Sequence, residues 1–105
     1  MKIIYNNILP FNGFEAINLF GIIFARKGMR LSVTAIQHER IHTEQMKELL
    51  YVFFYLLYFL EWIFKLFNYG LNSYNNISFE REAYANQSDS IYLQNRKRFA
   101  FLKYL

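Results

Sequence analysis

The chain has 105 residues and a formal net charge of +4, with 54% hydrophobic and 21% aromatic side chains but only 19% charged ones. This length has room for one modest hydrophobic core, so we expect residues 1–105 to form a single small domain. The lack of cysteine excludes disulfides and thiolate ligands, so any metal site must use histidine and carboxylate.

The apolar composition and the distribution of charge indicate which partners the chain has. So many hydrophobic side chains exceed what a domain of this size can bury, so we expect contact with a membrane surface or a second copy. The basic excess lies entirely in residues 96–105, among aromatic side chains. This basic tail suits either an anionic lipid surface or simple packing. One short basic cluster is a poor phosphate-binding footprint, so we expect no nucleic-acid partner.

The N-terminal segment does not resemble a signal peptide. Asn6, Asn7 and Pro10 interrupt its apolar residues, so no continuous hydrophobic core forms. We therefore expect no cleaved signal peptide, and a location in the cytoplasm or at the periphery of a membrane.

The next segment predicts a β-hairpin. Residues 16–25 are rich in Ile and Phe, and a glycine-containing turn at residues 26–28 leads into a short second strand at residues 29–32.

A helix that carries a metal-binding motif is predicted to follow. Thr34 and Gln37 form a T-x-x-Q capping box, so this helix should begin near Thr34. Its second turn contains His38, Glu39 and His42 in an H-E-x-x-H string. Residues four apart lie one above the other on a helix, so both imidazoles can reach one ion while Glu39 points toward bound water. The alternative is a solvated helix face that carries these residues by accident.

Residues 49–67 are expected to continue as a helix that is apolar on nearly all sides. Such a helix is buried, oligomeric or in contact with lipid. A single membrane span would place His42 and Glu80 on opposite sides of the bilayer, and Glu61 argues against a span. We therefore favour a helix at a membrane surface or in a dimer interface. An unbroken helix would barely allow the chain to return to Glu80, so we expect either a break or bend near residues 60–62 or a stretched return strand.

The chain should then return toward the motif. The polar residues 68–78 are predicted to form a loop, and Ser78 could cap a second helix that starts at Phe79. Asp89 and Ser90 are expected to mark a break before a short C-terminal segment.

The return helix bears the candidates for a third metal ligand. A catalytic zinc ion needs three protein ligands, and with no third histidine the last one must be a carboxylate. The candidates are Glu80, Glu82 and Asp89. Glu80 and Glu82 point about 200° apart on a helix, so only one of them can face the histidines.

The motif and the return helix together resemble the gluzincins, zinc peptidases in which H-E-x-x-H is followed by a helical glutamate in a pattern such as E-x-x-A-D. Residues 80–84 (EREAY) match that pattern in part, with Tyr84 in place of the aspartate. The overall scale is similar to that of the minigluzincins, which are minimal single-domain members. The apolar helix also looks similar to those of the membrane-associated CAAX-prenyl-protease branch.

This resemblance implies roles for individual residues. His38, His42 and Glu80 would hold Zn²⁺, and Glu39 would be the general base that activates water for hydrolysis of a peptide or protein substrate. A donor to the transition-state oxyanion cannot be histidine, since both are ligands. The remaining candidates for that donor are Tyr84, Tyr92 and Arg81.

The sequence therefore predicts an α+β fold that is mostly α, in one small zincin-like domain. It should contain an N-terminal β-hairpin, a long H-E-x-x-H helix with an apolar extension, and a return helix that bears the glutamate. The expected function is zinc-dependent peptide hydrolysis. The alternatives are a membrane-associated helical protein whose motif is accidental or binds metal without catalysis, and an oligomeric interaction module built on residues 49–67.

Overall fold

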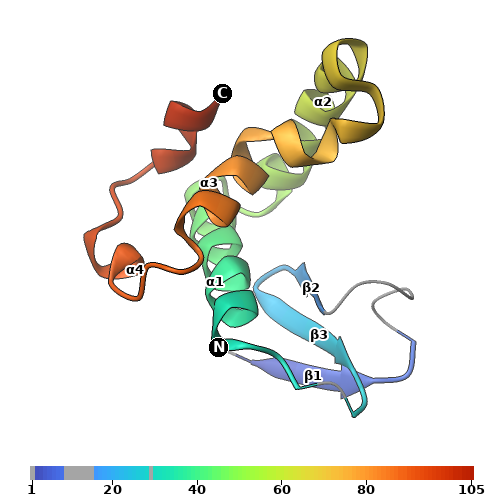
Figure 1. The fold of residues 1–105 in the computed structure, drawn as a ribbon, viewed down its shortest axis with the longest axis vertical. Helices are drawn as coiled ribbons and strands as arrows, with labels where there is room; N and C mark the ends of the chain where they lie inside the picture. Colours follow the sequence, from blue (N-terminus) through green and yellow to red (C-terminus); the bar gives the residue numbers. More distant parts are fainter. Residues whose placement is uncertain (1, 9–15, 29) are drawn as a thin grey trace.

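The structure is a computed structural model that describes residues 2–8, 16–28 and 30–105. Within these ranges a three-stranded sheet precedes four α-helices, so the fold is α+β and mostly α, as predicted. The sheet lies at one end of the molecule and the C-terminus at the other (Figure 1). Pro10, and Met29 of the predicted second strand, lie outside the described residues.

The sheet is built around a central buried strand. Its members are β1 (Ile3–Asn6), β2 (Ala16–Leu19) and β3 (Ile22–Arg26). β3 lies in the middle, antiparallel to β2 and parallel to β1. Its side chains Ile23 and Ala25 are fully buried, and they lie on the same face of the sheet because side chains alternate along a strand. β1 is an addition to the predicted hairpin.

The predicted hairpin is present, but its turn lies elsewhere. The chain reverses at Phe20 and Gly21, inside the predicted first strand of residues 16–25. Both residues have positive φ, 53° and 89°, which matches the twist of antiparallel strands and which glycine adopts at no steric cost. The hairpin turn predicted at residues 26–28 is therefore wrong. β3 ends there, and residues 30–32 lead into the first helix without pairing as a strand.

The motif helix α1 (Val33–Glu48) begins one residue earlier than predicted. Its N-cap is Ser32, whose Oγ accepts a hydrogen bond from the backbone N–H of Ala35 at 3.0 Å. A serine in this position satisfies one of the donors that the first helical turn leaves unpaired. The helix is confirmed, but its predicted capping box of Thr34 and Gln37 is wrong.

A tight bend separates α1 from the apolar helix α2 (Val52–Tyr69). Leu50 and Tyr51 both have positive φ, 55° and 62°, which is unusual for side chains of this size. The bend carries Phe54 into a buried cluster against α1 and the return helix, where burial of one aromatic side chain contributes roughly 2 kcal/mol. Neither alternative predicted for the return is present: α2 continues through residues 60–62, and the return segment is helical rather than a stretched strand.

The return segment contains three helical pieces: the 3₁₀ turns Gly70–Asn72 and Tyr74–Asn76, and helix α3 (Ser78–Asn86). The loop predicted at residues 68–78 is therefore partly helical. Ser78 is the first residue of α3 rather than its cap. The carboxylate of Glu61 takes the capping role, accepting hydrogen bonds from the backbone N–H and the Oγ of Ser78, each at 2.6 Å. Through this contact α2 fixes the start of α3.

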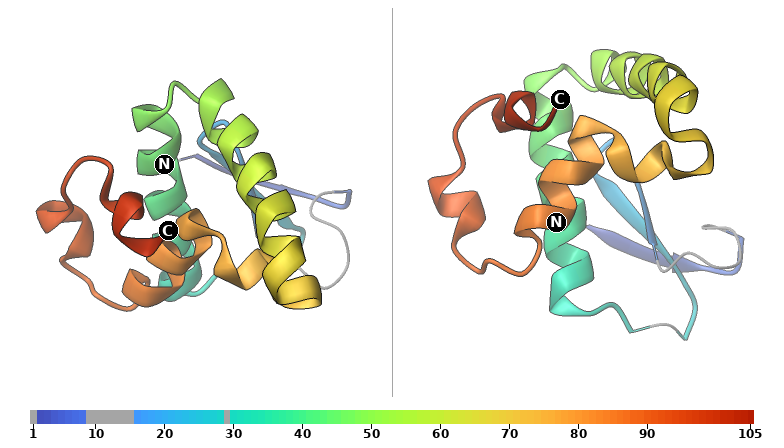
Figure 2. Two further views of the ribbon diagram at one scale, coloured as in Figure 1. Left: turned by 90° about the horizontal axis from the view of Figure 1, so that it is seen from above. Right: turned by 45° about the horizontal axis from the view of Figure 1, so that its top comes forward.

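The last part of the chain folds back over α1 and α3 (Figure 2). Asp89 lies between α3 and the short helix α4 (Tyr92–Asn95), so the predicted break is confirmed. A final 3₁₀ helix (Ala100–Tyr104) packs against α3. Its Phe101 joins the buried cluster, with its ring centroid 4.7 Å from that of Phe79.

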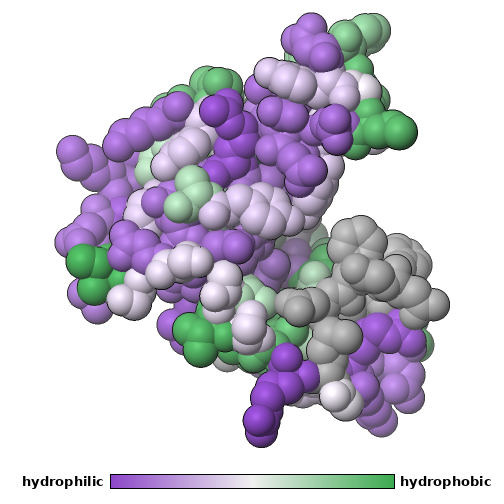
Figure 3. All heavy atoms as spheres, viewed as in Figure 1, coloured by the Kyte–Doolittle hydropathy of each residue, from purple (hydrophilic) through white to green (hydrophobic). Residues whose placement is uncertain are grey.

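Helix α2 lies on the outside of the molecule. By length and composition alone, Val52–Asn72 could cross a membrane, which is weak support for a span. Most of its side chains are exposed in the described structure, and hydrophobic side chains protrude at this end of the molecule (Figure 3). Only its inner face contacts the rest of the protein, and this face borders the candidate site.

Candidate metal centre

Two histidines project from one face of α1. His38 and His42 lie one helical turn apart with ring centroids separated by 4.7 Å, and the residues are 7% and 5% exposed. The i, i+4 spacing of the motif produces this arrangement directly. Glu80, in the first turn of α3, faces the two imidazoles because α3 packs against α1.

The three side chains meet at one point. Nε2 of His38 lies 3.1 Å from Nε2 of His42, and Oε1 of Glu80 lies 3.1 and 3.2 Å from these nitrogens. Ligand atoms bound to a tetrahedral zinc ion at about 2.0–2.1 Å are about 3.3 Å from one another. The group could therefore hold a metal ion with little rearrangement.

Hydrogen bonds behind the site set the protonation of His42. Gln45 donates its amide N–H groups to the carbonyl oxygen of Phe79 and to the carboxylate of Glu82, each at 3.0 Å. Its Oε1 must then face Nδ1 of His42, 2.8 Å away, and can only accept. Nδ1 therefore carries a proton, and Nε2, which faces Glu80, is the nitrogen available to a metal ion.

His38 is oriented in the same way from another direction. Its Nδ1 lies 2.8 Å from Oε1 of Gln87, the residue that follows α3. An amide oxygen accepts hydrogen bonds, so Nδ1 donates to Gln87 and Nε2 is the nitrogen that faces Glu80. The non-ligating nitrogen of a metal-bound histidine usually donates to an oxygen in this manner. Both imidazoles thus turn Nε2, the nitrogen that a metal ion would bind, toward the Glu80 carboxylate.

Two imidazole nitrogens and a carboxylate oxygen around one buried point favour a cation. In the metal-free protein that cation is a proton: burial alone would lower the pKa of His42, but the Glu80 carboxylate raises it to about 9. Burial likewise favours the protonated form of Glu80, yet His42, His38 and Tyr58 outweigh it and hold the pKa of Glu80 below its usual range. A divalent ion would replace the proton and satisfy all three ligand atoms.

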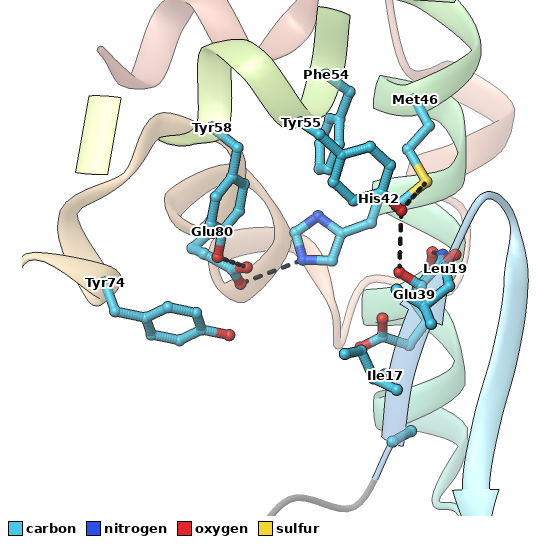
Figure 4. A pocket seen from close by; sticks show the side chains of 12 residues that line it. Ile17, Leu19, Glu39, His42, Met46, Phe54, Tyr55, Tyr58, Tyr74 and Glu80 are labelled. Atoms are coloured by element: carbon cyan, nitrogen blue, oxygen red, sulfur yellow. Dashed lines mark hydrogen bonds and ion pairs between the residues drawn. The ribbon is translucent and has the colours of Figure 1, made fainter. Parts of the chain in front are cut away.

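Tyr58 of α2 holds the carboxylate in place. Its hydroxyl donates to Oε2 of Glu80 at 2.7 Å, which leaves Oε1 for the metal position (Figure 4). Burial and the adjacent carboxylate raise the pKa of Tyr58, so the phenol stays protonated and remains a donor. A second contact of this kind commonly orients a carboxylate ligand.

A cavity of about 320 Å³ opens beside the candidate ligands His42 and Glu80, which form part of its wall. Glu39 lies in its wall, across from Glu80 and Tyr74 (Figure 4). Burial raises the pKa of Glu39 by more than His42 and His38 lower it, which suits a group that exchanges a proton near neutral pH. The rest of the wall is mostly apolar or aromatic and includes Ile17, Leu19, Met46, Phe54 and Tyr55.

The other two candidate ligands lie elsewhere. Glu82 is completely buried, is turned away from Glu80, and accepts a hydrogen bond from Nε of Arg96 at 2.6 Å. Asp89 is exposed beyond the end of α3. The structure thus places Glu80, and neither Glu82 nor Asp89, beside the histidines.

Part of the basic tail is packed inside the protein. The guanidinium of Arg96 lies between the carboxylates of Glu82 and Glu48 at N–O distances of 2.6–3.1 Å, and its side chain is only 5% exposed. Burial alone would raise the pKa of Glu82, but the bonds from Arg96 and neighbouring groups lower it. The other basic residues of the tail are exposed: Lys97, Arg98 and Lys103.

Of the three candidate oxyanion donors, Tyr84 lies beside the histidines and the other two do not. Its ring centroid is 4.5 Å from that of His38, and its hydroxyl interacts with that of Tyr74, which lines the cavity. Arg81 instead donates to backbone carbonyls at the C-terminus, and Tyr92 donates to a buried carboxylate outside the site.

The sequence interpretation missed four residues that complete the site: Tyr58, Tyr74, Gln45 and Gln87. Tyr58 and Tyr74 lie in aromatic and asparagine-rich runs in which nothing distinguishes them from their neighbours. Gln45 does carry a signal, because it follows His42 by three positions and helical spacing places it within reach of Nδ1. Gln87 follows Glu80 by two turns of α3, but its contact with His38 depends on how the two helices pack.

Comparison of the chain with known protein families, with curated proteins and with solved structures finds no match. The resemblance to gluzincins therefore remains a prediction, and the function has to be argued from the chemistry of the site.

Proposed function

We propose that this protein is a zinc-dependent peptidase in which His38, His42 and Glu80 hold the ion and Glu39 is the general base. The observation that carries the proposal is the convergence of three potential ligand atoms, 3.1–3.2 Å apart, beside a cavity with a carboxylate in its wall. A cation site that borders an open cavity suits chemistry on a bound molecule better than a purely structural role.

The donor set supports zinc. Two imidazole nitrogens and one carboxylate oxygen are a common ligand set of catalytic zinc, and three protein ligands leave a fourth position for water or substrate. Calcium and magnesium prefer sites made of oxygen atoms alone. The two histidines therefore favour zinc over these harder cations.

The residues around the cavity supply the steps of hydrolysis. A zinc ion in the site would polarise a peptide carbonyl and lower the pKa of a water molecule. Glu39 takes a proton from the attacking water and returns it to the leaving amine, and its raised pKa supports the second step. The hydroxyl of Tyr74 points into the cavity (Figure 4) and donates to the developing oxyanion, with Tyr84 behind it. Tyr58 continues to donate a hydrogen bond from its hydroxyl to the Glu80 carboxylate.

An extended peptide fits the surface beside the cavity. Strand β2 is an edge strand of the described sheet, and its residues line the cavity together with Glu39 and His42. A peptide that adds to a sheet edge gains backbone hydrogen bonds and directs alternate side chains into adjoining pockets. The apolar wall then favours a peptide or protein substrate with an apolar residue next to the cleaved bond.

The test measures zinc and hydrolysis in the same preparations. Wild-type protein should hold one zinc ion per chain and cleave peptides of a mixed library, with products identified by mass spectrometry. Glu39→Gln should keep the zinc and cleave at least about a hundredfold more slowly, because a general base contributes that much. Glu44→Gln, on another face of the same helix, is the matched control and should change neither quantity.

Two outcomes would contradict the proposal. Cleavage by Glu39→Gln at the wild-type rate would remove the catalytic role, as expected for the alternative of a non-catalytic membrane-associated or oligomeric protein with an incidental or structural metal site. Wild-type protein that takes up no zinc would leave no basis for a metal site of either kind.

A further inference from the structure

The outer face of α2 carries a continuous apolar stripe. Its members are Phe53, Leu57, Leu60, Phe64 and Phe67, all exposed and spaced three or four residues apart. Residues at this spacing share one side of a helix. Phe64 and Phe67 are 69% and 86% exposed. An uncovered apolar surface of this extent marks an interaction site.

The charged residues of α2 are turned away from this stripe. Glu61 caps α3 through Ser78, and Lys65 lies 3.9 Å from the Glu61 carboxylate. Both side chains are mostly buried, 14% and 18% exposed. The outer face therefore presents no charge over the length of the helix, about 27 Å at 1.5 Å per residue.

The C-terminal segment adds a second surface of mixed character. Packing of Arg96 and Phe101 anchors it to the protein. Between and after these anchors the segment exposes a mixture of basic and apolar side chains: Lys97, Arg98, Phe99, Leu102, Lys103 and Leu105. This segment and α2 lie at the same end of the molecule, away from the sheet (Figures 1 and 2).

The carboxylates of this end are already engaged inside the protein. Glu48 and Glu82 both bind Arg96. Glu61 binds Ser78 and Lys65, and Glu80 contacts the two histidines. The side-chain charges of residues 97–105 are all positive, because this segment contains Lys97, Arg98 and Lys103 but no Asp or Glu. A second copy of the chain would bring the same lysines and arginines together without acidic partners, whereas an anionic surface would complement them.

We propose that the outer face of α2 and the exposed side of residues 97–105 form one docking surface for a bilayer with anionic lipids. The apolar stripe inserts into the boundary between headgroups and acyl chains, and the basic side chains contact the headgroups. The helix lies along the membrane rather than across it, because Tyr58, near its middle, is hydrogen-bonded to Glu80. A spanning α2 would carry this buried carboxylate into hydrocarbon.

The experiment uses the full chain and vesicles of defined composition. The sole tryptophan, Trp62, lies in α2 and reports on the helix without labelling. Vesicles of phosphatidylcholine with phosphatidylglycerol should bind the protein in flotation assays and shift the Trp62 emission to shorter wavelength. Pure phosphatidylcholine vesicles should bind at least about tenfold more weakly, because each basic side chain near an anionic surface contributes several-fold.

Variants separate the two parts of the surface. Phe64→Glu with Phe67→Glu should weaken binding to both kinds of vesicle by about tenfold or more. Lys97→Gln with Lys103→Gln should weaken binding to the anionic vesicles alone. Val33→Glu, an equally exposed apolar residue on α1, is the matched control and should bind as the wild type does. Circular dichroism of every variant checks that the fold is retained.

Three results would overturn this inference. They are equal binding to both vesicle types, binding unaffected by Phe64→Glu with Phe67→Glu, and a stable dimer in light scattering that those changes dissociate. The last result would assign the stripe to a second copy. None of these measurements depends on zinc or hydrolysis, so their outcome is independent of the proposed peptidase activity.

Discussion

Oε1 of Gln45 lies 2.8 Å from Nδ1 of His42, and this contact turns Nε2 of the imidazole toward Glu80. The amide is itself held in one orientation by Phe79 and Glu82. One glutamine thus determines which nitrogen of His42 is available as a ligand.

Replacing Gln45 should weaken metal binding without removing a ligand. Gln45→Leu keeps the approximate volume but removes the acceptor for Nδ1 of His42, and loss of such a contact typically lowers metal affinity 10–100-fold. Zinc competition against a chromogenic chelator measures the effect. Gln87→Leu should act in the same direction through His38, and the exposed Gln94→Leu should have no effect. Unchanged affinity in Gln45→Leu would show that the contact does not orient the ring.

Glu80 and Glu82 should respond differently to the same chemical change. Glu80→Gln removes a ligand charge and should abolish stoichiometric zinc, as measured by elemental analysis after buffer exchange. Glu82→Gln should retain zinc at saturating concentration but lower the free energy of unfolding by about 3 kcal/mol, because it leaves the buried Arg96 charge incompletely paired. The reverse result, with zinc lost only from Glu82→Gln, would show that Glu80 is not the third ligand.

Arg96 should stabilise the fold far more than its basic neighbours. Arg96→Met leaves Glu82 and Glu48 without their buried partner and should cost about 3–5 kcal/mol in denaturant unfolding. Arg98→Met removes an exposed charge two residues away and should stay within about 0.5 kcal/mol of wild type. Equal stabilities of the two variants would mean that the tail is not anchored through Arg96.

Zinc binding should release a proton. The pKa of His42 is raised above its ordinary value of 6.5 to about 9 in the metal-free protein, mainly because Glu80 outweighs the effect of burial. His42 is then protonated at neutral pH, so zinc must displace that proton, and apparent affinity should rise about tenfold per pH unit until about 9. The raised pKa of His42 contributes stability to the metal-free fold that is fully present below pH 6.5 and is lost as pH rises through about 9.

Calorimetry checks the proton release directly. Titrations at neutral pH in buffers with different ionisation enthalpies should show about one proton released for each zinc ion bound. Binding heats that do not vary with the buffer would contradict a protonated His42 in the metal-free site.

Local spacing predicted part of this structure, and tertiary packing decided the rest. The helix that carries His38 and His42 was predictable because i, i+4 periodicity is a property of the chain itself. The bend at Leu50 and Tyr51 was not, since no glycine or proline marks it and the burial of Phe54 stabilises it. The turn of the hairpin was not predicted at Gly21, because the apolar residues on both sides of this glycine read as one continuous strand.

The candidate site divides in the same way. Glu39 and the two histidines could be read from the motif, whereas the choice of Glu80 over Glu82 depended on a resemblance. Tyr58 could not be predicted at all, because its role arises only when α2 folds back along α3. Residues that orient the ligands come from segments distant in sequence, and no local pattern records such contacts.

The double attachment of α2 to α3 has a mechanical consequence. Tyr58 holds the carboxylate of Glu80, and one turn further along α2 Glu61 holds the first residue of α3. The third ligand is thus clamped to α2 at two points, while both histidines belong to α1. Any force that displaces α2 relative to α1 changes the distance between these ligands. The position of α2 therefore controls the distance between Glu80 and the two histidines.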